Sequence, residues 1–259
     1  MDHLYSIEVA GVRLPCALEF PELAPKLCAT PLNSASCSAV PISIPAAHWR
    51  FYEEAGLPHN PYGEHSALAS YYSEALLPYD RMLFHSVAVR WRDRAYLISA
   101  PSGVGKSTQA KYLQALRPGE FSIICGDRPA LEFCRAPSDA SADPASVSDC
   151  SVTVHPSPWN GKEGWHGASA APLGGIVFLV RGKKNSVIPL TAKQAAVAAY
   201  IQFIHTATRE DVVRRGAEML SQMLPTVPLW GMTTCTVPDS TRLLLETVFS
   251  ASDSSQGRS

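Results

Sequence analysis

Hydrophobic and polar positions alternate along the first part of the chain, and this pattern predicts strands. Apolar residues recur at every second position over residues 5–19, and Gly11 interrupts the run, so we expect a hairpin. Residues 21–47 are rich in Pro, Ser and Ala, which indicates loops with short strands. The segment 49–56 fits either an edge strand or a turn of helix. The chain therefore begins with a β-rich lead-in.

From residue 65 onward the spacing changes repeatedly between helical and strand periods. Apolar residues at helical spacing predict a helix over residues 65–79, and two strands follow within 82–100, joined by a polar turn. A glycine-rich loop comes next, and then a helix from about Lys106 to Leu116. Further strands are predicted at 121–127, 128–133, 151–155, 173–180 and 227–235. Further helices are predicted at 191–208, 209–224 and 239–249.

This mixture predicts an α/β fold, with a mixed sheet flanked by helices and a β-rich N-terminal lead-in. We divide the chain into a β-rich region packed on the core, a domain that contains the glycine-rich loop, and a tail, over residues 1–64, 65–250 and 251–259. The small, polar and acidic segment 136–150 reads as a surface loop, and the tail as disordered.

Composition narrows the functional class. Of the 259 residues, 46% are hydrophobic, and the net charge of −1 does not suggest a nucleic-acid binder. The seven cysteines are odd in number and contain no C-x-x-C pair, which favours free thiols in a reducing compartment over zinc or disulfides. The longest apolar runs have strand length and there is no signal peptide. We therefore expect a soluble cytoplasmic protein that does not contact membranes.

The stretch YLISAPSGVGKSTQAKYL, residues 96–113, reads as strand, glycine turn and helix. It matches the phosphate-binding Walker A pattern except that Ala100 replaces the first glycine. Such a loop points successive backbone N–H groups into one hollow, to which the helix adds its positive end. Lys106 would reach the β- and γ-phosphates, and the Ser107 hydroxyl could bind magnesium. The predicted nucleotide-binding residues are Ser102, Gly103, Val104, Gly105, Lys106, Ser107 and Thr108.

Other polar residues could complete this site. Asp127 ends the apolar run SIIC, where a P-loop protein places a carboxylate for magnesium. His85 precedes the loop by one strand and could reach the phosphates, although a lone histidine is more often a core residue. His155 has the same two interpretations. Lys162 either brings a positive charge to the phosphates or is a solvated loop lysine.

Taken together, LFHSVAV, APSGVGKST, IICGDRPAL, HPSPWNGK and PLGGIVFLVRGKKNSV resemble HPr kinase-like proteins of the phosphoenolpyruvate-carboxykinase-type P-loop fold. More narrowly, the chain resembles the stand-alone bacterial group that includes kinases of lasso-peptide precursors. The resemblance covers roughly residues 65–250. It implies an ATP- and Mg²⁺-dependent kinase with a peptide or protein acceptor, and family members often form homo-oligomers. Its implied catalytic residues are His85, Lys106, Asp127 and Lys162, and its implied metal ligands are Ser107 and Asp127.

One departure leaves alternatives open. The family carries two adjacent acidic residues after the P-loop, whereas this chain has Gly126 and Asp127. Either Asp127 alone serves the metal while His85 takes the acceptor proton, or the chemistry is weakened. The second case describes a nucleotide-binding protein with little or no transfer activity, acting as a sensor or as a peptide-maturation partner. Carboxykinase chemistry is disfavoured, because no cluster of oxyacid-binding arginines is evident.

Overall fold

The computed structural model describes residues 3–33, 39–135, 150–167, 169–206 and 208–249. The hairpin expected over residues 5–19 is present. Strand β1 (His3–Val9) pairs antiparallel with β2 (Val12–Leu18), and the short β3 (Thr30–Pro31) lies on the other side of β1. Ala10 and Gly11 both have positive φ, as a two-residue hairpin turn of this hand requires. Most of the expected loop 136–150 and the tail fall outside the described residues.

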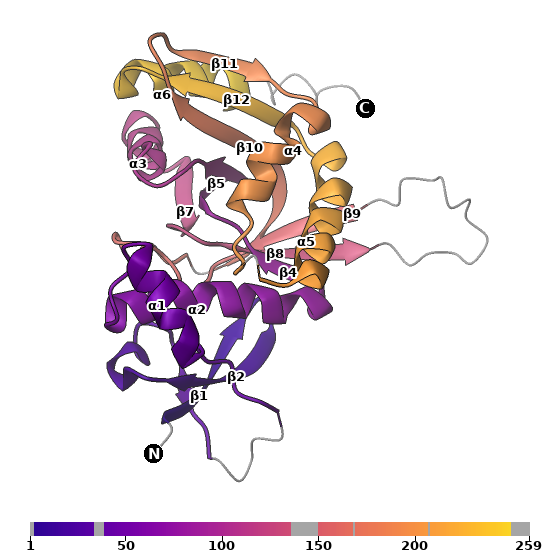
Figure 1. The fold of residues 1–259 in the computed structure, drawn as a ribbon. Coiled ribbons are helices and arrows are strands. Elements are labelled where there is room, and N and C mark those ends of the chain that lie inside the picture. Colours follow the sequence, from indigo (N-terminus) through magenta and orange to yellow (C-terminus); the bar gives the residue numbers. More distant parts are fainter. Residues whose placement is uncertain (1–2, 34–38, 136–149, 168, 207, 250–259) are drawn as a thin grey trace, which may run out of the picture.

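Two helices connect this small sheet to the rest of the molecule (Figure 1). The ambiguous segment 49–56 is helical, because α1 spans Ala46–Glu54. Helix α2 spans Pro61–Leu76 and starts four residues before the expected helix, since the Asn60 side chain caps it. Leu68 and Tyr72 of α2 pack in one cluster with Ile7 of the hairpin and Trp159 of the main domain. The division at residue 64 thus falls inside α2, and the lead-in shares its core with the main domain.

Within the described residues, the main sheet has nine strands. Its order is β4-β8-β9-β10-β6-β5-β7, with β12 added to β10 and β11 added to β12. Strands β6, β10 and β12 are mutually parallel, and β7 runs the same way because both β6 and β7 are antiparallel to β5. The strands are β4 (Arg81–Leu83), β5 (Ser86–Trp91), β6 (Arg94–Ser99), β7 (Phe121–Cys125), β8 (Ala130–Arg135), β9 (Cys150–His155), β10 (Ala171–Arg181), β11 (Ser186–Pro189) and β12 (Leu229–Thr234).

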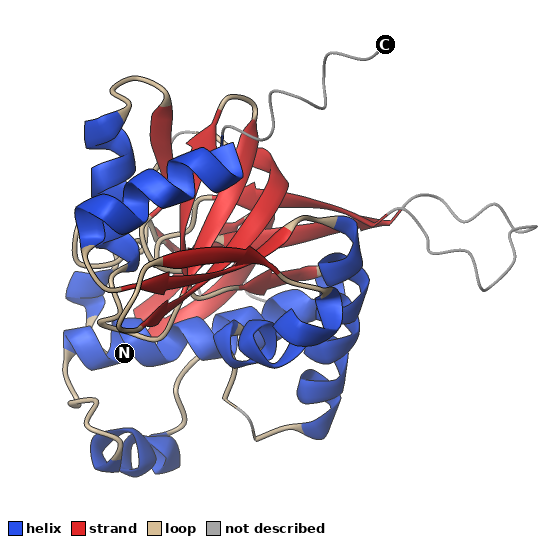
Figure 2. Cartoon of the chain, turned by 90° about the horizontal axis from the view of Figure 1, so that it is seen from above, coloured by secondary structure: helices blue, strands red, loops and turns tan. Residues whose placement is uncertain are grey.

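Helices cover both faces of this sheet (Figure 2). The buried apolar run over residues 176–179 of strand β10 shows why, since its successive side chains enter opposite cores. Ile176 and Phe178 pack in the cluster that contains α4 (Ala192–Gln202) and α5 (Glu210–Met223). Val177 and Leu179 pack in the cluster that contains α3 (Lys106–Leu116) and α6 (Val237–Leu244). The expected α/β fold, with a mixed sheet between helices and a β-rich lead-in, is confirmed.

Two details differ from the sequence-based expectation. Helix α4 was expected over residues 191–208 but ends at Gln202, where Phe203 turns extended and forms a bridge with Phe84. The edge strand β11 was not expected at all, because its residues follow a run of charged and glycine positions. None of the helices within the described ranges combines the length and the apolar character needed to cross a membrane.

Candidate functional site

The sheet topology brings His85, the glycine-rich loop and Asp127 to one edge. The loop follows the carboxyl end of β6, Asp127 follows the carboxyl end of β7, and His85 precedes the amino end of the antiparallel β5 between them. Backbone contacts fix this meeting point. The Ser86 N–H donates to the Asp127 carbonyl at 2.9 Å, and the Ser99 hydroxyl donates to the His85 carbonyl at 2.8 Å. Ligands of open α/β sheets bind at such carboxyl ends.

The loop itself has the conformation that phosphate binding needs. Gly103 and Gly105 have φ of +78° and +123°, which side chains rarely allow, and α3 begins at Lys106. Ala100 is buried and is not among the residues of positive φ, so this position does not demand the glycine of the Walker pattern. Its carbonyl instead accepts a hydrogen bond from Lys106 Nζ at 2.9 Å. Ser102 is exposed, and Ser107 and Thr108 lie in the first turn of α3.

Lys106 and His85 contact each other directly. Lys106 Nζ lies 2.9 Å from His85 Nε2, and His85 Nδ1 lies 3.0 Å from the side-chain oxygen of Gln202 at the end of α4. An amide oxygen only accepts, so Nδ1 carries the proton, and Nε2 presents its lone pair to the ammonium group. Burial lowers the pKa of Lys106, and the nearby charge of Asp127 only partly offsets this. His85 is therefore held between Gln202 and Lys106 with Nε2 facing the phosphate loop.

Asp127 lies between His85 and Arg128. Its Oδ1 lies 3.4 Å from His85 Nε2, and its Oδ2 lies 3.3 Å from Arg128 Nε. Burial raises the pKa of Asp127, but the neighbouring charges of Arg128 and Lys106 favour the ionised form, and the pKa stays below its usual value. Nε2 has one bonding position, which we assign to Lys106, the closer of its two neighbours. Asp127 is ionised at neutral pH.

Position 126 has no room for a second carboxylate. A Cβ placed on Gly126 would lie 2.2 Å from the Asn160 carbonyl oxygen and 3.2 Å from Trp165 Cβ. The Gly126 N–H also donates to the Trp165 carbonyl at 3.0 Å. Gly161, with φ of +77°, brings the same loop against Asp127, since its Cβ position lies 3.2 Å from Asp127 Cβ. The backbone of residues 160–165 thus occupies the space that a side chain at position 126 would need.

Lys162 is not part of the contact network around Lys106. It is exposed in the turn that follows Gly161, one residue from the contact with Asp127. The next residue, Glu163, lies 3.6 Å from Lys111 of α3, so the turn is tied to the helix that carries the phosphate loop. Lys162 stands beside the site on a loop that packs against it, and its role in catalysis stays a prediction.

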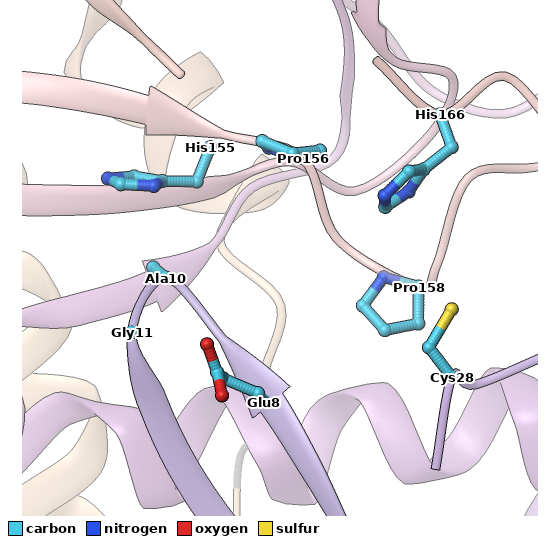
Figure 3. A pocket seen from close by; sticks show the side chains of 8 residues that line it. All are labelled: Glu8, Ala10, Gly11, Cys28, His155, Pro156, Pro158 and His166. Carbon is cyan, nitrogen blue, oxygen red and sulfur yellow. The ribbon is translucent and has the colours of Figure 1, made fainter. Parts of the chain in front are cut away.

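His155 belongs to a different place. Its Nε2 lies 2.7 Å from Glu132, and the ring lines a cavity of about 240 Å³ between the hairpin turn and the segment 155–166 (Figure 3). Cys28, Pro158 and His166 line the same cavity, and none of the phosphate-loop residues does. The interpretation of His155 as a ligand of the phosphate end finds no support in this geometry.

Three residues of the site were not expected from the sequence. Gln202 lies 117 positions from His85 and gives no local signal, so only the fold reveals it. Arg181 ends the central strand β10 and donates to the Gly103 carbonyl at 2.8 Å, and its place at the end of a parallel strand could have suggested it. Arg128 stands inside the motif GDRPA, next to the expected carboxylate, yet its charge was not assigned a role.

The donor set fits a magnesium ion held mainly by a substrate. Within the described part of the chain, no three His, Cys, Asp or Glu side chains gather closely enough to hold a metal. Magnesium is commonly bound through one or two carboxylates together with phosphates and water. The hard oxygens of Asp127 and Ser107 suit that mode.

In the comparisons with known proteins, the chain matches solved structures but neither family models nor curated proteins. No family model matches the chain, and no curated protein matches it. Eighty-five chains of solved structures match, including the HPr(Ser) kinase/phosphatase from Coxiella burnetii. That structure is 9% identical, with a TM-score of 0.32, and the match covers 68% of this chain and 99% of the other. A likeness this weak carries no argument about function, which must rest on the site itself.

Proposed function

We propose that the chain is an ATP- and magnesium-dependent phosphotransferase that moves the γ-phosphoryl group to a serine hydroxyl of a peptide or protein. The observation that carries the proposal is the convergence of Lys106 Nζ, His85 Nε2 and Asp127 Oδ1, with separations of 2.9 Å and 3.4 Å, beside a loop shaped for phosphate. Phosphoryl transfer needs positioned positive charge, a carboxylate and an acceptor for the hydroxyl proton.

Nucleotide binding would release His85 for its task. In the free protein Lys106 donates to the Ala100 carbonyl and to His85 Nε2. When phosphates enter the loop, the ammonium group turns to their oxygens, which are stronger acceptors, and the Nε2 lone pair becomes available.

The transfer itself then follows from the chain's own groups. The serine oxygen attacks the γ-phosphorus in line, the new O–P bond forms as the bond to the β-phosphate oxygen breaks, and ADP carries away that electron pair. His85 Nε2 accepts the hydroxyl proton while Gln202 holds the ring through Nδ1. Lys106 stabilises the developing charge on the phosphoryl oxygens. Asp127 and Ser107 would hold magnesium, which would supply neutralisation of the phosphate charge.

A second function is favoured by one observation. Because the Asn160 carbonyl fills the space beside Gly126, the site has one carboxylate where transfer chemistry of this kind commonly has two. A protein that binds nucleotide in the same loop and transfers nothing, acting as a sensor or a peptide-maturation partner, is consistent with that arrangement. Membership of the lasso-peptide kinase group, a homo-oligomeric state and a cytoplasmic location belong to the first proposal, that of the kinase.

Transfer of labelled γ-phosphate distinguishes the two functions. The protein is incubated with labelled ATP, magnesium and a library of serine-containing peptides, and ATP affinity is measured in parallel. Lys106→Ala should abolish ATP binding, whereas Lys111→Ala, an exposed lysine on the same helix, should leave it unchanged. Asp127→Asn should retain ATP binding and lose transfer.

The outcomes separate cleanly. Phosphopeptides formed by the wild-type protein and not by Asp127→Asn support the kinase. Tight ATP binding without any transfer would reject the kinase and favour the nucleotide-binding function. Equal ATP affinity of Lys106→Ala and the wild type would reject both.

A further inference from the structure

Arg128 is held in a fixed position beside the candidate site. Its Nη1 donates to the Ser66 carbonyl of α2 at 2.9 Å, and its backbone N–H donates to the Trp159 carbonyl at 2.9 Å. Ser157 in turn donates to the Arg128 carbonyl. Two separate segments, α2 and the loop that follows β9, therefore position this residue, while about 20% of its side chain stays exposed.

One nitrogen of this guanidinium lacks an acceptor. Arg128 Nε is buried and forms no hydrogen bond with any described residue, although Asp127 Oδ2 lies 3.3 Å away. The contact with Asp127 is thus one of charge with charge, without hydrogen-bond geometry. A buried donor left without an acceptor is unfavourable, and more so when it is charged. The arrangement suits an additional acceptor of negative charge at this position.

The balance of charges points the same way. Lys106 and Arg128 are cations and Asp127 is the anion between them, and position 126 cannot carry a second carboxylate because of the Asn160 carbonyl. The group has an excess of positive charge before any nucleotide or metal binds. A planar guanidinium can donate hydrogen bonds to two phosphate oxygens at once. In a site with two carboxylates, a bound metal would supply that positive charge instead.

We propose that Arg128 binds the terminal phosphate of the nucleoside triphosphate and, in the free protein, neutralises Asp127. This inference rests on the proposed function, since it assigns a further phosphate-binding residue to the same site. It has two consequences of opposite sign. Removing the charge of Arg128 should strengthen the binding of a divalent cation at Asp127, and it should weaken the binding of a nucleotide that carries no metal.

The test measures both affinities in the full-length protein. Mn²⁺ alone is titrated and followed by electron paramagnetic resonance, and ATP is titrated in EDTA and followed by calorimetry. For Arg128→Gln we expect Mn²⁺ to bind at least about tenfold more tightly, and metal-free ATP at least about tenfold more weakly, the lower limit of what one adjacent opposite charge does to a carboxylate. Arg128→Lys, which keeps the charge, should lie between this variant and the wild type in both measurements.

A matched control separates this role from a structural one. Arg81 is also about 20% exposed, pairs with Glu132 and donates to a backbone carbonyl, that of Ala10, so Arg81→Gln removes a similar set of contacts elsewhere. It should change neither affinity. A fall of both affinities in Arg128→Gln, or no change in either, would overturn the inference. Unchanged ATP binding by Arg128→Gln would overturn this inference but leave the proposed function standing. A wild-type protein that binds no ATP would overturn both.

Discussion

The tight space at Gly126 makes a prediction whose size can be worked from the structure. In Gly126→Ala the new Cβ would lie 2.2 Å from the Asn160 carbonyl oxygen, a distance that no real contact tolerates. The obstacle is backbone, so the loop over residues 160–165 must move. That movement also strains the hydrogen bond from the Gly126 N–H to the Trp165 carbonyl, which is 3.0 Å long.

Two destabilising contributions add in Gly126→Ala. Overpacking of a well-packed site costs about 1–3 kcal/mol. Weakening one buried backbone hydrogen bond costs about 1 kcal/mol more. We therefore expect a loss of about 2–4 kcal/mol in the free energy of unfolding, measured by urea denaturation. The variant should also bind nucleotide less well, because the displaced loop contacts Asp127 through Gly161.

A second glycine serves as the control. In Gly231→Ala the new Cβ would meet only side-chain carbons of Leu190, at 3.4 Å and beyond, which is ordinary contact. That variant should change the free energy of unfolding by less than about 1 kcal/mol. If Gly126→Ala were as stable as Gly231→Ala, residues 160–165 would not exclude a side chain at position 126, and the explanation for the single carboxylate would be wrong.

Two further predictions concern histidines. Gln202→Ala removes the acceptor of His85 Nδ1, so we expect kcat of phosphate transfer to fall at least about tenfold with KM for ATP unchanged. Gln202→Glu keeps an acceptor and should restore much of the rate. Equal kcat values for wild type and Gln202→Ala would contradict the role of His85 as proton acceptor. Burial lowers the pKa of His65 from 6.5 to about 4, so between these pH values the unfolded chain takes up a proton that the folded protein does not. The contribution of His65 to the free energy of unfolding is fully present above pH 6.5 and should fall by roughly 3 kcal/mol as the pH drops to 4. Urea denaturation at several pH values measures this fall. His65→Gln should flatten that dependence, and an unchanged pH profile would show that the buried ring is not its source.

Much of the site could be anticipated because its motifs are local. The strand, the glycine turn and the helix at Lys106 follow one another in the sequence, and their periodicity and glycine spacing determine the loop. The helix expected from about Lys106 to Leu116 corresponds to α3. Asp127 was expected near Lys106 because a carboxylate that ends a neighbouring strand lies at the same edge of a sheet.

What could not be anticipated depends on packing between distant segments. Gln202 reaches His85 only because α4 ends early, where Phe203 leaves the helix to pair with Phe84. The role of Gly126 was interpreted as a lost acidic residue, whereas the structure shows a position closed by the backbone of Asn160. Sequence periodicity contains no information about such an approach of two backbones.

The closure of position 126 and the charge of Arg128 are best understood as one arrangement. A second carboxylate would repel Asp127 and would need a cation to offset that repulsion. A metal ion is the cation that usually does this. Here a backbone carbonyl excludes that carboxylate, and a guanidinium held by Ser66 stands beside the remaining one. Ser66 lies on α2, which packs against the hairpin. If Arg128 binds phosphate as we propose, its position beside the candidate site is set in part by the helix that also packs against the N-terminal hairpin.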